Sequence, residues 1–174
     1  TVEPAEHFIN WQQDPFGNYL ARIVFPEKSD RLSVRVDLVA ELTVINPFDF
    51  FVEESAETFP FDYSEVNKHE LAPYLATTQA SPILQTWLEN NKPSADTKII
   101  DALVAINQAV HRDVAYQLRM EPGVQSSEQT LQLAMGSCRD SGWLLVEIMR
   151  HYGIAARFVS GYLVQLTPDV KSID

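Results

Sequence analysis

The hydrophobic residues of this chain change their spacing once, and that change limits the folds open to it. Between residues 31 and 38 apolar and polar residues alternate, which is the pattern of a strand with one buried face. Between residues 99 and 110 apolar residues recur every three or four positions, which is the pattern of a helix. These apolar positions are Leu32, Val34, Val36 and Leu38, then Ile99, Leu103, Ile106 and Val110. The sequence therefore predicts an α+β fold, with a β unit first and a helical core after it.

The β unit is expected to be an antiparallel meander of about three strands. Strand-like runs cover His7–Gln13 and Tyr19–Phe25, and clusters of turn residues separate them from each other and from the alternating segment. Residues 46–51 break the alternation with a proline and several aromatic residues. We expect residues 1–66 to form a β-rich N-terminal region and residues 67–174 to form the core.

Capping signals mark the first helices of the core. Ser81 followed by Pro82 is typical of a helix start, because serine caps a helix and proline fits its first position. Lys92-Pro93 is expected to end this helix. We expect Ser94 or Asp96 to cap the long helix that follows.

The rest of the core alternates extended and helical segments. Residues 114–120 read as a short extended piece, and Ser126 or Ser127 is expected to cap a helix of about two turns. Gly153 suits the position just after the end of the last helix. Residues 155–166 are predicted to form a strand.

Charge and cysteine content exclude several classes of function. The net charge is −11 and the 13 basic residues are scattered, which argues against nucleic acid or a membrane surface as a partner. The longest apolar runs are too short to cross a bilayer. One cysteine cannot form an internal disulfide, so we expect a reducing, cytoplasmic compartment. One cysteine and four dispersed histidines lack metal-ligand spacing, so no metal or other cofactor is expected.

Cys138 lies in the motif Gly136-Ser137-Cys138-Arg139-Asp140-Ser141, at the start of a strongly apolar predicted helix. The first turn of a helix offers unpaired N–H groups and a partial positive charge, and both favour a thiolate. A lone cysteine is also commonly a small buried hydrophobe. On these residues alone, both readings stay open.

A nucleophilic cysteine needs a base within reach, and no histidine here supplies one obviously. His151 follows Cys138 by thirteen residues on the same helix, about 20 Å along its axis. His111 lies near the end of the preceding helix, where a cation complements the dipole. His7 and His69 fit surface or satisfied core positions. Geometry from the sequence leaves the thiol without a partner.

Three segments together carry a resemblance to a known family. They are residues 106–116, the motif at 136–141, and residues 152–163, which include Gly153-Ile154-Ala155-Ala156-Arg157 and Ser160-Gly161-Tyr162-Leu163. In this combination, over about residues 95–166, the chain resembles the bacterial transglutaminase-like superfamily. The β-rich segment resembles the N-terminal region that precedes this core in bacterial members. Residues 120–125 resemble members in which the core begins a much longer polypeptide.

The resemblance implies a papain-like fold in which Cys138, opening a helix packed on an antiparallel sheet, is the nucleophile. The family's histidine and aspartate lie on strands after the Ser-Gly-Tyr-Leu strand, in a segment of the His-Ala-Trp kind. Residues 164–174 contain no histidine. We therefore expect this chain to be a piece of a longer protein, holding only the N-terminal half of the core, and to be inactive by itself.

Three neighbours of the thiol have simpler expected roles. Asp140 is expected to complement the helix dipole and to bond free N–H groups rather than to orient a base. Arg139 is expected to pack or to form an ion pair. Tyr116 is expected to be a core aromatic rather than an active-site hydroxyl.

Two functions follow from these observations. The first is thiol acyl transfer or hydrolysis of a protein or peptide amide through Cys138. The alternative is a non-catalytic protein-interaction module with the same fold. The truncated sheet would also leave the strand at 155–166 with an unpaired edge, so we expect self-association or a disordered C-terminus.

Overall fold

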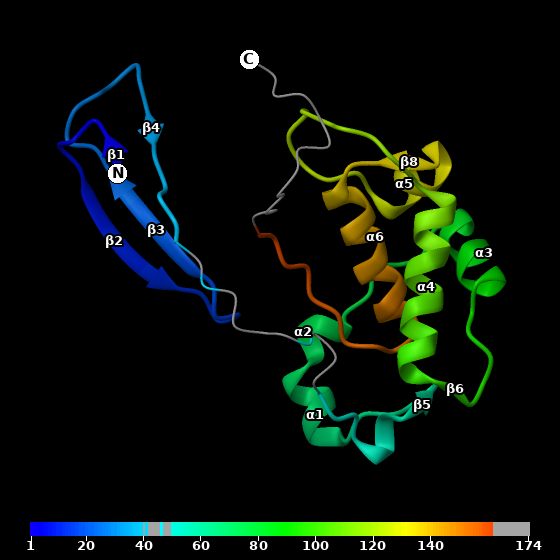
Figure 1. The fold of residues 1–174 in the computed structure, drawn as a ribbon. Coiled ribbons are helices and arrows are strands. Elements are labelled where there is room, and N and C mark those ends of the chain that lie inside the picture. The colour runs from blue at the N-terminus through cyan, green and yellow to red at the C-terminus, as the bar shows by residue number, and fades with distance from the viewer. Residues whose placement is uncertain (40, 42–45, 47–49, 162–174) are drawn as a thin grey trace. The chain divides into compact units, whose positions relative to one another are not determined.

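The computed structural model describes residues 1–39, 41, 46 and 50–161. The chain divides into two compact units, Thr1–Phe50 and Phe51–Asp174 (Figure 1). Strands occur in both units and helices in the second, which confirms the α+β class.

The first unit consists of two separate strand pairs. β2 (Phe8–Gln13) and β3 (Tyr19–Val24) form an antiparallel hairpin with Phe8 opposite Val24 and Gln13 opposite Tyr19. The Asp14 carboxylate closes the hairpin by accepting bonds from the N–H groups of Phe16 (2.9 Å) and Asn18 (2.8 Å). The first two predicted strands are therefore confirmed.

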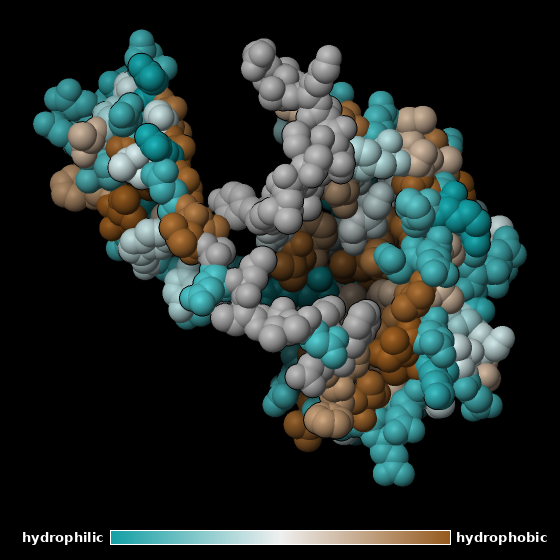
Figure 2. Space-filling view, in the orientation of Figure 1, coloured by the Kyte–Doolittle hydropathy of each residue, from teal (hydrophilic) through white to brown (hydrophobic). Residues whose placement is uncertain are grey.

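The third predicted strand is largely absent. Only β4 (Ser33–Val34) forms within residues 31–38, and it pairs antiparallel with β1 (Val2–Glu3) instead of joining the hairpin. The meander was wrong because the chain's own N-terminus supplies the partner for this segment. The predicted buried face is wrong as well, since Leu32, Val34, Val36 and Leu38 are 57–66% exposed. Brown, apolar atoms are correspondingly visible on this unit in Figure 2.

The second unit holds the helices. Its elements are η1 (Glu54–Ala56), β5 (Thr58–Phe59), α1 (Glu65–Glu70), α2 (Ala72–Leu75), α3 (Pro82–Asn90), β6 (Thr97–Lys98), α4 (Ile99–Asp113), β7 (Ala115–Tyr116), α5 (Ser127–Leu133), β8 (Met135–Gly136) and α6 (Cys138–His151). β5 pairs antiparallel with β6, and β7 pairs parallel with β8. Residues 51–66, expected in the N-terminal region, group with the helices because Phe59 is buried against Ile99 and Ala102.

Two of the three predicted caps form. Ser81 accepts a bond from the N–H of Leu84 at the start of α3, and Ser126 accepts one from Gln129 at the start of α5. The predicted cap of α4 at Ser94 or Asp96 is wrong. Instead, the N–H of Ile99 donates to the main-chain carbonyl of Glu57 (2.8 Å), so a distant backbone oxygen replaces the side-chain cap.

The main core lies between α3, α4 and α6, and α4 runs beside α6 (Figure 1). Its buried residues are Leu84, Trp87, Ile106, Ala109, Val110, Val114, Leu144, Ile148 and Met149. The indole N–H of Trp87 donates to the Asp113 carboxylate (2.8 Å), which joins α3 to the end of α4. This packing fixes the axis of α6 and therefore the position at which Cys138 begins it.

The chain leaves α6 through Gly153, whose φ of +78° is the left-handed conformation expected after a helix end. The predicted strand is absent over residues 155–161, and residues 162–166 lie outside the described residues. Side chains hold this segment in place of a strand ladder: the Tyr63 hydroxyl accepts from the Ala155 N–H, and Arg150 donates to the Ala156 carbonyl. Self-association through this strand stays a prediction, and the C-terminal tail at 162–174 lies outside the described residues.

Candidate active site

Cys138 is the first residue of α6, and its thiol is exposed. The reading of this residue as a buried hydrophobe is therefore wrong. Ser137 precedes the helix, and the Asp140 carboxylate accepts bonds from the Ser137 N–H (2.8 Å) and hydroxyl (2.7 Å). These bonds close the first turn and leave the thiol at the open end of the helix.

A groove of about 320 Å³ opens at the thiol. Its walls come from the second half of α4, from β7 and from the first two turns of α6. The lining residues are Asn107, Val110, His111, Val114, Tyr116, Cys138, Ser141, Gly142 and Leu145. The groove combines apolar walls with a few polar groups, which is the usual make-up of a small-ligand site.

Two lining residues differ from what the sequence indicated. His111 lies in the last turn of α4, as expected, but it also shares the groove with Cys138. Tyr116 is 70% exposed, so its prediction as a core aromatic is wrong. Asn107 and Ser141 also line the groove, and no spacing signal in the sequence singled them out.

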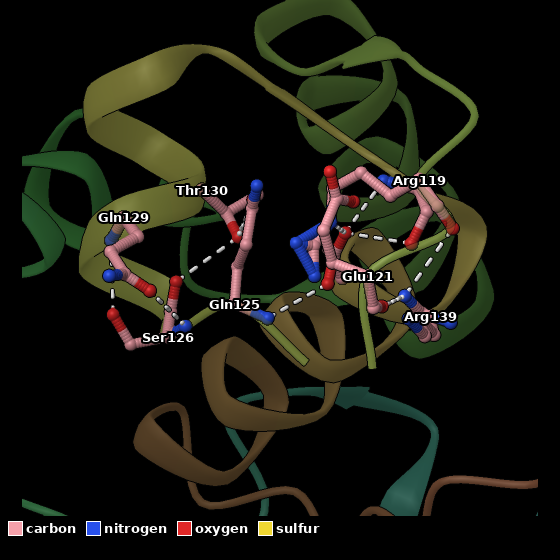
Figure 3. Close-up of polar contacts among 9 residues, drawn as sticks. Arg119, Glu121, Gln125, Ser126, Gln129, Thr130 and Arg139 are labelled. Carbon is pink, nitrogen blue, oxygen red and sulfur yellow. Dashed lines mark hydrogen bonds and ion pairs between the residues drawn. The ribbon is translucent and has the colours of Figure 1, made fainter. Parts of the chain in front are cut away.

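Asp140 is the centre of a polar cluster at the start of α6, and Figure 3 shows two of its partners, Arg119 and Gln125. Its side chain is fully buried. Besides Ser137, it accepts from the Gln125 N–H (2.8 Å) and from Nε of Arg119 (3.0 Å). Burial alone would raise the pKa of Asp140, but the hydrogen bonds from Gln125 and Ser137, together with the charge of Arg119, hold this pKa below its ordinary value. The expected role of Asp140 in bonding free N–H groups is confirmed.

Arg139 binds the segment at residues 119–125, which also contacts Asp140. Its guanidinium donates to the main-chain carbonyls of Arg119 (3.4 Å) and Glu121. The expected ion pair of Arg139 is not among the salt bridges of the described residues. Residues 119–125 are thus bonded to the first turn of α6 at three points, by Arg119, Glu121 and Gln125.

The capping box of α5 continues this arrangement. The Ser126 hydroxyl accepts from the Gln129 N–H, and the Gln129 side chain accepts from the Ser126 N–H (3.1 Å). The Thr130 hydroxyl donates to the Gln125 side chain (3.2 Å). The segment before α5 is therefore bonded to both α5 and α6.

Within the described part of the second unit, the other two histidines, His69 and His151, do not line the thiol groove. His151 lines a different groove, with Leu88, Glu89 and Tyr152 among its neighbours. His69 lies in α1, and His7 contacts the Pro4 carbonyl (2.7 Å) in the first unit. Among the described residues, no group of three His, Cys, Asp or Glu side chains is arranged to hold a metal ion.

Two family profiles match parts of the chain. The profile described as "Transglutaminase-like superfamily" matches residues 87–172, and "Bacterial transglutaminase-like N-terminal region" matches residues 1–41. No curated protein and no solved structure matches the chain. In the part of the chain that the structure describes, no helix is long and apolar enough to span a bilayer.

Proposed function

The chain belongs to the transglutaminase-like superfamily, and from this membership and the groove at Cys138 we propose that the protein carries out thiol acyl transfer or amide hydrolysis. Cys138 is the nucleophile and the substrate is a protein or peptide amide. The observation that carries the proposal is an exposed thiol on the first residue of a helix, facing a groove of about 320 Å³.

The start of α6 takes part in the reaction through the Cys138 thiolate and through the Cys138 N–H. The thiolate sulfur attacks the amide carbonyl carbon, and the tetrahedral intermediate expels ammonia or an amine to leave a thioester. An amine or water then attacks the thioester and releases the thiol. Cys138 is the first residue of α6, where a helix offers no carbonyl partner to the N–H group, so the Cys138 N–H is available to stabilise the oxyanion.

A base must take the thiol proton. The family resemblance places a histidine and an aspartate on strands after Gly161-Tyr162-Leu163, and residues 164–174 contain no histidine. We therefore propose that these two partners of Cys138 are missing from the 174 residues and that the 174-residue chain alone is inactive. The single cysteine supports a reducing compartment, for which the cytoplasm is our proposal.

The test uses a chain extended through its downstream sequence. Hydroxamate formation from a glutamine-containing peptide and hydroxylamine reports acyl transfer, and ammonia release reports loss of the amide. Cys138→Ala is expected to abolish both, whereas Ser141→Ala, a small change in the same groove, is expected to keep turnover within about tenfold. Full activity in the Cys138→Ala variant would refute the proposal.

The exposed apolar residues of the first unit favour a second candidate function. Phe8, Trp11 and Tyr19 are 69–76% exposed, and none of the described residues of this unit is buried. A two-stranded ribbon is marginally stable by itself, so this surface suits a partner protein. An extended chain that never forms a hydroxamate but binds a protein through β2 and β3 would favour the interaction module.

A further inference from the structure

The proposed nucleophile lies two residues before a buried ion pair. Asp140 has no exposed surface, and the Arg119 side chain that pairs with it is only 16% exposed. The other ion pairs of the described residues, such as Arg112 with Asp113, have more exposed members. The Arg119–Asp140 pair is therefore the one least screened by solvent among them.

A buried carboxylate in this position opposes the proposed chemistry if it is left unbalanced. Asp140 is on the same turn of α6 as Cys138, and its negative charge repels a thiolate and a developing oxyanion there. The donors to Asp140 from Ser137 and Gln125 are neutral, so among its bonded partners only Arg119 brings an opposite charge.

The pair also fixes a wall of the groove. Arg119 follows Tyr116 by three residues, and Tyr116 lines the groove with Cys138. The bond from Arg119 to Asp140 and the bond from Gln125 to the same carboxylate hold the intervening segment against the first turn of α6. Arg119 therefore supplies a positive charge beside this wall and one of the contacts that hold it.

We propose that Arg119 is a positioning residue of the site, which balances the Asp140 charge and so keeps the start of α6 receptive to negative charge at Cys138. The catalytic role of Arg119 in this inference rests on the proposed function. Its physical content concerns the local field at the thiol and can be tested in the 174-residue chain.

The test compares two alkylating reagents of similar size and different charge. The thiolate displaces iodide from either, but iodoacetate is an anion and iodoacetamide is neutral. The ratio of their rate constants at Cys138 reports the local field, and it cancels changes in thiolate fraction and in general accessibility. The chain has only this cysteine, so alkylation is followed by mass with no other thiol to compete.

The two halves of the pair are expected to change the ratio in opposite directions. Arg119→Gln leaves Asp140 unbalanced and should lower the iodoacetate-to-iodoacetamide ratio about threefold or more at low salt, whereas Asp140→Asn leaves Arg119 unbalanced and should raise it. The double variant should return close to the starting ratio. Arg119→Lys keeps the charge and should change little.

Arg112→Gln is the matched control, because it removes an arginine from another Arg–Asp pair that does not line the thiol groove. Its ratio should stay unchanged. A purely structural role would change both reagents' rates together, so equal ratios in all variants, or shifts of one sign in both single variants, would overturn the inference. The activity of Cys138→Ala tests the proposed reaction separately, and its result is independent of the alkylation ratios measured in the other variants.

Discussion

The bonds of Asp140 predict a large loss of stability when its charge is removed without changing its shape. In Asp140→Asn, the single remaining oxygen can replace Oδ2, which accepts from Arg119 and Ser137. The new NH₂ group then faces the Gln125 N–H, which donates to Oδ1 at 2.8 Å in the parent protein. Two donors then oppose each other in a buried place, and Arg119 loses its counter-charge.

The size of the effect follows from these two losses. An unsatisfied buried N–H costs about 1–3 kcal/mol, and removing one partner of a buried ion pair costs about 3–5 kcal/mol when no acceptor remains. Because the asparagine oxygen still accepts from Arg119, we expect a total of about 3 kcal/mol. Urea unfolding followed by far-ultraviolet circular dichroism measures this, since the helices all lie in the second unit among the described residues.

Asp101→Asn is the matched control. Asp101 is also an acidic residue in the first turn of a long helix, but it is exposed. Its loss removes only a helix-dipole contribution, which is worth less than about 1 kcal/mol. If Asp140→Asn costs no more than Asp101→Asn, the cluster around Asp140 does not form as described.

Three further predictions follow from the same unit. Hydrogen bonding to Arg112 holds the pKa of Asp113 below its ordinary value, and the contacts of Asp140 do the same for its own pKa. The stability that these two carboxylates contribute is complete above about pH 4 and is lost as pH falls through the lowered pKa values. Acid unfolding measures this loss. Burial raises the pKa of Tyr152 to about 12. The stability that its neutral hydroxyl contributes is therefore present below about pH 10 and is lost as pH rises toward 12. Tyr152→Phe should flatten the plot of unfolding free energy against pH in this range. Gly136→Ala would place a Cβ 2.9 Å from the Asp140 Cβ, so we expect a loss of about 1–3 kcal/mol, and an unchanged Tm would contradict this close approach.

The sequence predicted those elements correctly that are held by hydrogen bonds between residues close together in the chain. Ser81-Pro82 and Ser126 cap the helices they were expected to cap, because the bond that makes each cap spans only three residues. The turn after α6 at Gly153 has the same character. These elements could be read from the sequence because propensity and structure agree within a few residues.

The predictions that were wrong concern elements that depend on contacts between residues far apart in the chain. The start of α4 depends on the Glu57 carbonyl, and β4 depends on β1, some 30 residues earlier; no pattern within either segment encodes these partners. The same holds at the site. The resemblance and the helix start pointed to Cys138, but nothing in the sequence pairs Arg119 with Asp140, 21 residues later.

His111 raises the remaining question about the site, because the structure brings it to the groove that Cys138 lines. The family resemblance places the base downstream, whereas this groove offers an imidazole from α4. His111 is exposed in the last turn of α4, and lining the groove does not by itself make it the group that takes the thiol proton.

We therefore expect His111→Gln in the extended chain to lower acyl transfer by less than about tenfold, since loss of a general base costs about 10²–10⁴-fold. Asn107→Ala, one turn earlier on the same wall, controls for a change in groove shape. A loss of 10² or more in His111→Gln alone would assign the base to α4. In that case the downstream histidine would not be required, and the 174-residue chain should itself form a thioester.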